Sequence, residues 1–234
     1  MSKAKSTFCV TFCDKDWHLI ERCIEFILLQ SVKPDRVMFV GSGLLEKTHT
    51  AYDLCLKLGK RFKEYGILTS PTRKLPGWAR NKRAFFNQGP KEIVSFWDVD
   101  DDIHPKKCEF VKKVFVNPDV DALVHNYSRP EIPTFPSWEK VDDSDVIKIE
   151  PVISVEPEPE PIPDGWFNVP RTNVMTKNKQ PVAHGPISIR GSLAQHFRYK
   201  ENMSLGEDGT FCREIVNHPD FSLYYTPKKL IIYN

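Results

Sequence analysis

The 234-residue sequence lacks several features that would place it in a familiar class. Its 33 basic and 31 acidic residues leave a formal net charge of only +2, so the composition does not favour nucleic acid as a partner. No apolar run approaches the roughly 18 residues of a membrane-spanning helix. The six cysteines include no Cys-x-x-Cys pair, which disfavours disulfides and zinc. We therefore expect a soluble, cytoplasmic, globular protein.

The first 125 residues alternate between strand and helix patterns. Short β-branched and aromatic runs predict buried strands, and apolar residues at intervals of three and four predict helices between them. The expected strands are residues 7–13, 36–40, 67–69, 93–97 and 121–125, and the expected helices are 17–28, 51–62, 79–88 and one that begins near Pro105. This alternation predicts a Rossmann-like α/β fold, with a mostly parallel sheet and helices on both faces. Four lysines of the last helix are expected on its solvent face: Lys106, Lys107, Lys112 and Lys113.

Proline dominates the middle of the chain. Eleven of the 19 prolines lie between Pro130 and Pro186, and the alternating Glu-Pro segment at 156–161 is typical of an extended spacer. We expect residues 126–180 to form an insertion or a lid. Regular patterns then return, with a strand at 182–190, a helix at 206–217 and two strands at 221–225 and 230–233.

Four aspartates crowd the end of the strand at 93–97. They are Asp98, Asp100, Asp101 and Asp102. Two ionised carboxylates about 4 Å apart repel by roughly 4 kcal/mol at an effective dielectric near 20, and protonation, solvent or a cation must relieve that repulsion. Oxygen ligands favour Mg²⁺, Mn²⁺ or Ca²⁺ over zinc. Asp14 and the Gly-Ser-Gly segment 41–43 also follow strands, so we expect all three groups in one cleft at the carboxyl ends of the strands.

Other interpretations of the aspartates remain open. A helix-loop-helix calcium site would use Asp98, Asp100, Asp102 and Glu109, but Ile103 stands where that loop needs glycine. A phosphotransferase of the haloacid dehalogenase type would carry Asp-x-Asp after its first strand, whereas here it follows several strand and helix units. A solvated acidic turn is the simplest alternative, because turns favour aspartate. Four carboxylates exceed what a turn requires, and we favour a metal site.

Three blocks in the chain resemble those of GT-A-fold glycosyltransferases, close to the broad family 2. The segment 76–81 (PGWARN) is similar to an Ala-Arg-Asn block, the segment 93–102 to an Asp-x-Asp block, and Gly206-Glu207-Asp208 to a Glu-Asp block. Their order and spacing agree, and the resemblance spans most of residues 7 to 217. In size the chain is also similar to the soluble glycosyltransferases that large algal viruses (chloroviruses) encode.

The resemblance implies a function. A GT-A enzyme would move a sugar from a nucleotide-diphosphate donor, a UDP- or GDP-sugar, to a hydroxyl of a glycan or glycoprotein acceptor. Asp98 and Asp100 would hold Mn²⁺ or Mg²⁺ against the diphosphate, with Asp98 toward the ribose, and a divalent ion would stabilise the charge of the leaving group. Asp208 would be the general base. Asp101 or Asp102 would assist as outer-shell ligands.

The same resemblance divides the chain. Residues 1–125 would bind the donor, and residues 181–234 would form an acceptor-side half that completes a single GT-A domain. Arg80 and Asn81 would line the nucleotide pocket, at the start of an expected helix whose free amide groups favour an anion.

Two strand ends depart from the family pattern. The family usually has Pro-x-Tyr-Asn at the end of the first strand and an acidic residue at the end of the second, and neither is present here. Thr11, Asp14 and Ser42 are the donor-binding candidates by position. A sugar-nucleotide nucleotidyltransferase remains the alternative enzyme, although it would usually carry a glycine- and lysine-rich phosphate loop near the first strand. A non-enzymatic calcium-binding module is the third possibility.

Overall fold

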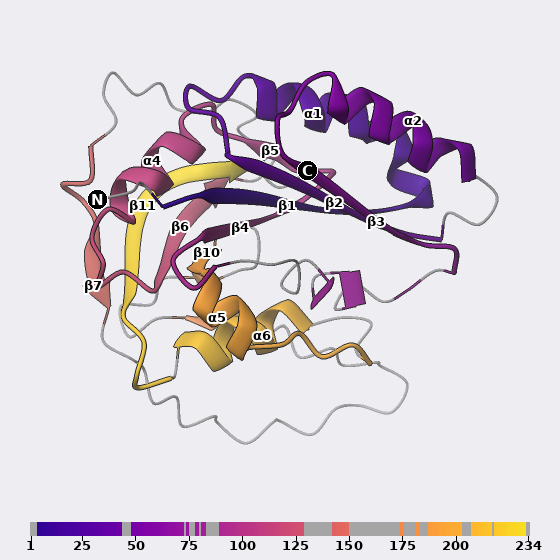
Figure 1. The fold of residues 1–234 in the computed structure, drawn as a ribbon. Helices are drawn as coiled ribbons and strands as arrows, with labels where there is room; N and C mark the ends of the chain where they lie inside the picture. The colour runs from indigo at the N-terminus through magenta and orange to yellow at the C-terminus, as the bar shows by residue number, and fades with distance from the viewer. Residues whose placement is uncertain are drawn as a thin grey trace.

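A central sheet with helices on both faces organises the chain (Figure 1). The computed structural model describes residues 4–43, 48–72, 74, 78–79, 81–82, 89–128, 142–149, 174–175, 181–182, 187–202, 207–216 and 218–232. The strands of the main sheet are β1 (Ser6–Cys13), β2 (Arg36–Ser42), β3 (Tyr65–Ser70), β4 (Ile93–Asp98), β5 (Asp102–Ile103), β6 (Ala122–Ser128), β7 (Ile147–Ile149), β10 (Ile187–Arg190) and β11 (Leu223–Ile232). The helices are η1 (Asp14–Leu19), α1 (Ile20–Leu28), α2 (Thr48–Gly59), α4 (Lys107–Val114), α5 (Gly191–His196) and α6 (Glu207–Val216). Two short strands, β8 (Val174–Met175) and β9 (Pro181–Val182), pair with each other.

The order of strands across the sheet is β3-β2-β1-β4-β10-β6-β11-β5, with β7 also paired to β11. Strands β1 to β4 are parallel neighbours, and β6 is parallel to β11. Strand β10 runs antiparallel between β4 and β6, while β5 and β7 run antiparallel on β11. The predicted class, a mostly parallel α/β sheet covered on both faces, is confirmed.

Alternation along the strands assigns each side chain to one face, as the pleat of a strand requires. On β1, Phe8, Val10 and Phe12 pack with buried residues of α1 and α2, whereas Cys9 packs with the other layer. On β4, Phe96 belongs to the layer of α5 and α6. Figure 1 shows α1, α2 and α4 on one side of the sheet and α5 and α6 on the other.

Several expected boundaries differ from those observed. The two strands predicted at 221–225 and 230–233 are one strand, β11, whose pairing with β6 shifts register between Thr226 and Ile231. The exposed Pro227 lies in that irregular stretch, where a missing N–H is tolerated. Of the strand predicted at 182–190, β10 forms only its last part, and the helix α5 that follows was not predicted. The insertion expected at 126–180 lies largely outside the described residues.

Helix α4 corrects one expectation. Lys107 does not lie on a solvent face, because its side chain is only 1% exposed. It occupies the buried stripe of the helix together with Phe110, Val111 and Val114, at the spacing that turns residues to one side. Lys113, by contrast, is exposed.

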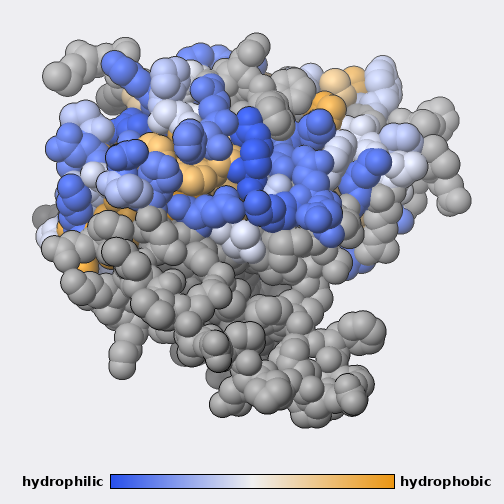
Figure 2. All heavy atoms as spheres, turned by 90° about the horizontal axis from the view of Figure 1, so that it is seen from below, coloured by the Kyte–Doolittle hydropathy of each residue, from blue (hydrophilic) through white to orange (hydrophobic). Residues whose placement is uncertain are grey.

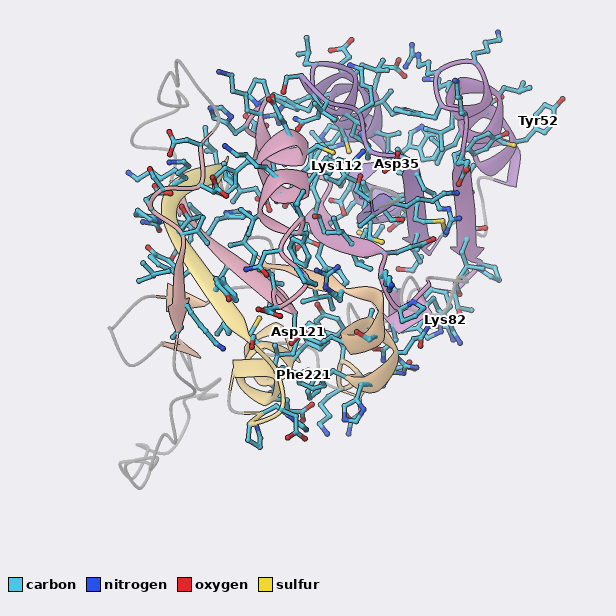
Figure 3. All side chains as sticks on the ribbon, turned by 60° about the vertical axis from the view of Figure 1, so that its left-hand side comes forward. Asp35, Tyr52, Lys82, Lys112, Asp121 and Phe221 are labelled. Atoms are coloured by element: carbon cyan, nitrogen blue, oxygen red, sulfur yellow. The ribbon has the colours of Figure 1, made fainter. Side chains whose placement is uncertain are left out.

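The other side of α4 is tied to the sheet by an ion pair. Lys112 Nζ lies 2.8 Å from Asp35 Oδ2 (Figure 3). The same carboxylate oxygen accepts a hydrogen bond of 2.8 Å from the backbone N–H of Ser6, the first residue of β1. These contacts hold the start of β1 against α4. They thereby help to fix the position of β1 in the sheet.

The described surface is mainly hydrophilic on the underside of the molecule, with apolar side chains in small patches (Figure 2). Large apolar side chains that are exposed include Leu29, Tyr52, Leu56, Val116 and Ile147. Among the described residues, none of the helices has the length and apolar character needed to cross a bilayer.

Candidate active site

The carboxyl ends of β1, β2, β3 and β4 meet at one edge of the sheet. The register pairs Thr11 with Asp98 across β1 and β4, and Cys13 with Ser42 across β1 and β2. Ser42 in turn pairs with Ser70 of β3. The structure therefore brings Thr11, Ser42 and Asp98, predicted from separate strand ends, to the same rim, where ligands bind in open α/β sheets.

A hydrogen bond joins the first and fourth strands at this rim. Thr11 donates from Oγ1 to Asp98 Oδ1 at 2.5 Å, and the backbone N–H of Val99 donates to the Thr11 carbonyl at 3.1 Å. Both contacts hold the Asp98 carboxylate in a fixed position relative to β1. The side chain of Asp98 is partly buried, so protein atoms hold it in place while part of it stays accessible to solvent.

The acidic loop, residues 98–102, turns tightly after β4. The backbone N–H of Asp101 donates to the Asp98 carbonyl at 3.1 Å, and Trp97 Nε1 donates to the Asp101 carbonyl at 2.9 Å. Asp102 and Ile103 then form β5 on the end of β11. A strand thus precedes the loop and another follows it, which excludes the helix-loop-helix geometry of the calcium alternative.

The four aspartates have different surroundings. Asp100 is exposed, Asp98 is partly buried, and Asp101 is only 5% exposed. Asp102 forms an ion pair with Arg22 of α1. The expectation that Asp101 or Asp102 assists a metal as an outer-shell ligand stays a prediction. In the structure Asp101 is buried and Asp102 is paired with Arg22.

The pKa of Asp100 is raised above its ordinary value. Loss of solvation is the main cause, and the negative charge of Asp98 is the second. A raised carboxylate pKa means that the ionised pair is destabilised, which is the condition that a divalent cation relieves. The donor set is oxygen only, as hard cations prefer. Among the described residues, no group of three or more His, Cys, Asp or Glu side chains is arranged so that it could hold a metal ion by itself.

The rim continues across β2 and β3 with small polar groups. Ser42 is buried, and Gly43 follows it with a φ of 77°, a conformation that side chains disfavour. The N–H of Gly43 donates to the Thr72 carbonyl at 3.2 Å, and Ser70 Oγ donates to the same carbonyl at 2.9 Å. The prediction of the third strand stopped at Thr69, so Ser70 was missed; continuing the strand by one residue would have found it.

The end of β1 leads directly into η1. Cys13 donates to Asp16 Oδ2 from its backbone N–H at 3.1 Å and from Sγ at 3.0 Å. Burial first, and then Asp16, raise the pKa of the Cys13 thiol, so the sulfur is a protonated donor and not a nucleophile. Asp14 is the first residue of η1, as its predicted place at the strand end requires, and its contact with the donor stays a prediction.

Asn81 has a structural role in the described part of the site. It is 2% exposed, and its Nδ2 donates to the Tyr199 carbonyl at 2.8 Å and to Glu201 Oε1 at 2.9 Å. The N–H of Tyr199 donates back to Asn81 Oδ1 at 2.7 Å. The amide thus clamps the segment after α5 to the region of the Ala-Arg-Asn block. Its predicted contact with the donor stays a prediction, and Arg80 lies outside the described residues.

Helix α6 is held close beneath β4 by aromatic contacts. Phe211 stacks on Tyr199 with ring centroids 3.8 Å apart, and both rings meet Phe96 edge-on at 5.8 Å. Phe96 precedes Asp98 by two residues on β4, and Asp208 precedes Phe211 by three residues on α6. The packing therefore brings the helix that carries Asp208 next to the strand that carries Asp98. The side chain of Asp208 lies outside the described part of the chain.

Comparison with known proteins identifies the fold. Neither a family model nor a curated protein matches the sequence. Solved structures do match: S. aureus TarS has a TM-score of 0.64 and 14% identity over 98% of this chain and 36% of its own. TarS 1–349 in complex with UDP has a TM-score of 0.65 and 14% identity, and the match covers 98% of this chain and 60% of that chain. TarS 1–349 in complex with UDP-GlcNAc has a TM-score of 0.64 and 13% identity, and the match covers 98% of this chain and 58% of that chain.

The chain has a GT-A fold. The likeness to these TarS structures extends over nearly all of this chain, which confirms the Rossmann-like sheet of the GT-A kind. The chain spans between about a third and three-fifths of the length of the TarS chains that it matches. At such low identity the likeness concerns the fold alone. The rim described above, with Thr11, Asp98 and Asp100 at the ends of β1 and β4, is the candidate active site because ligands bind at this edge of open α/β sheets.

Proposed function

We propose that this chain is a metal-dependent glycosyltransferase of the GT-A type, similar to family 2, which moves a sugar from a nucleotide-diphosphate donor to an acceptor hydroxyl. One observation carries the proposal. Asp98, hydrogen-bonded to Thr11, and Asp100, whose pKa is raised by loss of solvation and then by the charge of Asp98, lie at the ligand-binding edge of the sheet. The fold is shared with structures that were solved with UDP and UDP-GlcNAc.

Asp98 and Asp100 are the proposed ligands of Mn²⁺ or Mg²⁺. When bound, the cation would supply Lewis-acid stabilisation of the charge on the leaving diphosphate. Thr11 keeps the Asp98 carboxylate in place through its hydroxyl. Loss of solvation and, second, the charge of Asp98 raise the pKa of Asp100. A bound cation would offset the repulsion between the two carboxylates.

Asp208 is the proposed general base. It would take the proton of the acceptor hydroxyl as that oxygen bonds to the anomeric carbon and the bond from that carbon to the diphosphate breaks. The contact of Phe211 with Phe96 supports this role, since it keeps the first turns of α6 near the end of β4. A direct displacement of this kind inverts the anomeric carbon.

A uridine donor is the first choice to test, because the similar TarS structures hold UDP and UDP-GlcNAc. Ser42, together with Thr11 and Asp14, would line the nucleotide side of the rim, and Arg80 and Asn81 would complete it. The acceptor is proposed to be a glycan or a glycoprotein, on the resemblance alone.

Thermal unfolding with and without ligands tests the proposal. A ligand at a hundredfold excess over its Kd stabilises the folded protein by about 2.7 kcal/mol, which raises the Tm of a domain of this size by about 5 to 10 °C. We expect such a shift with UDP-GlcNAc and Mn²⁺ together, and a much smaller one when EDTA replaces Mn²⁺. GDP-sugars and Ca²⁺ serve as comparisons, and a response to Ca²⁺ alone would favour a calcium-binding module.

Two variants sharpen the test. Asp100→Asn should abolish the metal-dependent shift, whereas Asp119→Asn, the same change at an exposed site in the turn after α4, should leave it intact. Asp208→Asn should keep the donor-induced shift but lose transfer. Release of UDP from the donor would support a glycosyltransferase, and formation of pyrophosphate from UTP and a sugar 1-phosphate would support the nucleotidyltransferase alternative instead.

A further inference from the structure

Asn81 ties together two parts of the chain that are distant in sequence. Its Nδ2 donates to the Tyr199 carbonyl at 2.8 Å and to Glu201 Oε1 at 2.9 Å, and its Oδ1 accepts from the Tyr199 N–H at 2.7 Å. Both acceptors of the Asn81 amide therefore lie inside the protein, 118 and 120 residues further along the chain. Because the side chain is only 2% exposed, these bonds are shielded from competing water.

The segment 199–201 in turn contacts helix α6 through two side chains. The Tyr199 ring stacks on Phe211 of α6, with centroids 3.8 Å apart and an angle of 14° between the planes. Lys200 Nζ lies 3.5 Å from Glu214 Oε1, which is also on α6. The ring contact is buried and the ion pair is exposed, so the stack is the stronger of the two. This segment, called the bracket below, joins α6 to the Ala-Arg-Asn block.

The bracket also contacts the strand that leads into the acidic loop. The rings of Tyr199 and Phe211 each meet Phe96 of β4 edge-on, with centroids 5.8 Å apart in both pairs. All three rings are buried. Phe96 stands two residues before Asp98, and Phe211 stands three residues after Asp208. Since a closely packed core leaves few voids, the place of the Tyr199 ring helps to set how α6 lies against β4.

We propose that Asn81 is a positioning residue for the transfer step: it fixes the bracket, and the bracket keeps α6, the helix of Asp208, in place against β4. This inference rests on the proposed function. An apolar side chain could fill a buried position, but hydrogen bonds at 2.7 to 2.9 Å also fix its orientation. A misplacement of about 1 Å, caused far from the reacting atoms, lowers a rate by about a hundredfold.

A positioning role and a donor contact lead to different kinetics. If Asn81 contacted the donor, changing it would weaken the binding of UDP. If it positions α6, UDP binding stays as it is and kcat falls, because the general base is no longer held at the reacting atoms.

Three variants test the role. Asn81→Asp keeps the size of the side chain and the acceptor for the Tyr199 N–H, but it loses both donors and places a second carboxylate beside Glu201. In the double variant Asn81→Asp/Glu201→Gln, the introduced amide can donate to the introduced carboxylate and restore the link. Asn117→Asp is the matched control, because it makes the same change at an exposed position in the turn after α4.

Calorimetric titration with UDP in the presence of Mn²⁺ gives the Kd and the number of competent sites, and release of UDP from UDP-GlcNAc, with water as acceptor, gives kcat per site. We expect Asn81→Asp to bind UDP like the wild type while its kcat falls by about tenfold to a hundredfold. The double variant should recover much of this loss, and Asn117→Asp should match the wild type. A merely structural amide would lower the Tm and leave kcat per site unchanged. That result, or weaker UDP binding at unchanged kcat, would overturn the proposal.

Hydrogen exchange measures the bracket independently of activity. In Asn81→Asp the amides of α6 should exchange faster than in the wild type, while those of β1 and β2 keep their protection. Unchanged exchange in α6 would overturn the role of Asn81. If Asn81→Asp does not fold, Glu201→Ala takes its place, since it removes only the bond to an exposed residue. A kcat below that of the wild type would then support the proposal, and a wild-type kcat would overturn it.

The outcomes separate this inference from the proposed function. If the wild type neither binds UDP nor releases it from UDP-GlcNAc, or if Asp208→Asn releases it at the wild-type rate, the proposed function itself is wrong. If Asp208→Asn loses activity while folded Asn81→Asp keeps the wild-type kcat, the role of Asn81 is overturned and the proposed function stands.

Discussion

Asp98, Asp100, Asp101 and Asp102 share one residue type but not one environment. The first is bonded to Thr11, the second is exposed with a raised pKa, the third is buried, and the fourth pairs with Arg22. A run of acids in a sequence therefore predicts a site but not the division of tasks within it. The division depends on contacts with α1 and β1, which are distant in the chain.

Thr11 and Thr7 allow a paired test on β1. Thr11→Val removes the hydroxyl that bonds to Asp98. A hydrogen bond to a charged group contributes about 1.5 to 3 kcal/mol. We therefore expect kcat/KM to fall by about tenfold to a hundredfold, and the free energy of unfolding to fall by no more than about 3 kcal/mol. Activity assays and urea titrations measure both quantities.

Thr7→Val is the control for that test. Thr7 is 1% exposed, and its Oγ1 has no hydrogen-bond partner among the described residues. Removing an unsatisfied buried hydroxyl should stabilise the protein by about 1 kcal/mol and leave activity unchanged. Equal losses of activity in the two variants would show that the Thr11 hydroxyl has no particular role.

Lys107 also gives a pH dependence of stability. Its pKa is about 7 in the folded protein and about 10.4 in the unfolded chain. Between those values the unfolded chain holds the additional proton, so this residue makes the free energy of unfolding rise with pH, by up to about 1.4 kcal/mol per pH unit. Below pH 7 both states are protonated and the contribution is flat.

Urea titrations at several pH values from 6 to 9 measure this effect. The difference in free energy of unfolding, wild type minus Lys107→Met, should increase steadily above about pH 7. A difference that stays constant over this range would mean that Lys107 titrates normally, and hence that it is not buried as a charge.

Local patterns predicted most of the elements. The strands β1, β2 and β4 and the helices α1, α2 and α6 were expected near their observed bounds. Short β-branched and aromatic runs mark the strands, and helical spacing of apolar residues marks the helices. Lys107 was placed on the wrong side of α4, since its charge suggested solvent. The spacing from 107 to 110, 111 and 114 was the better signal, and it puts all four residues on one side.

Short elements were not predictable. Strands β5 and β7 have two and three residues, too few to show alternation, and each exists because β11 offers an edge for pairing. The antiparallel direction of β10 likewise depends on its partners β4 and β6. Such long-range pairing leaves no mark in the local sequence.

Helix α6 is predicted to depend on one aromatic stack. Phe211→Ala removes the ring that packs on Tyr199 and Phe96, and loss of a buried phenylalanine should lower the free energy of unfolding by about 3 to 5 kcal/mol. Tyr52→Ala, at an exposed aromatic of α2, should change it by less than about 0.5 kcal/mol. Urea unfolding compares the two; similar effects would contradict the packing of α6 against β4.

The architecture of the chain as a unit explains why one edge of the sheet carries the proposed chemistry. Parallel strands β1 to β4 deliver their last residues to the same rim, so residues that are distant in sequence become neighbours. The class of fold and the position of the rim followed from the sequence. The hydrogen bond between Thr11 and Asp98 and the clamp by Asn81 did not, because both require the register and packing of the folded protein.

Crystals of the protein grown with UDP and Mn²⁺, measured at the manganese absorption edge, test the central claim most directly. We predict an anomalous peak within bonding distance of Asp98 and Asp100 at the end of β4, next to the diphosphate of the nucleotide, and no peak there in crystals of Asp100→Asn. Nucleotide bound at this rim without manganese beside the two carboxylates, or manganese bound elsewhere on the protein, would contradict a metal-dependent glycosyltransferase built on this site.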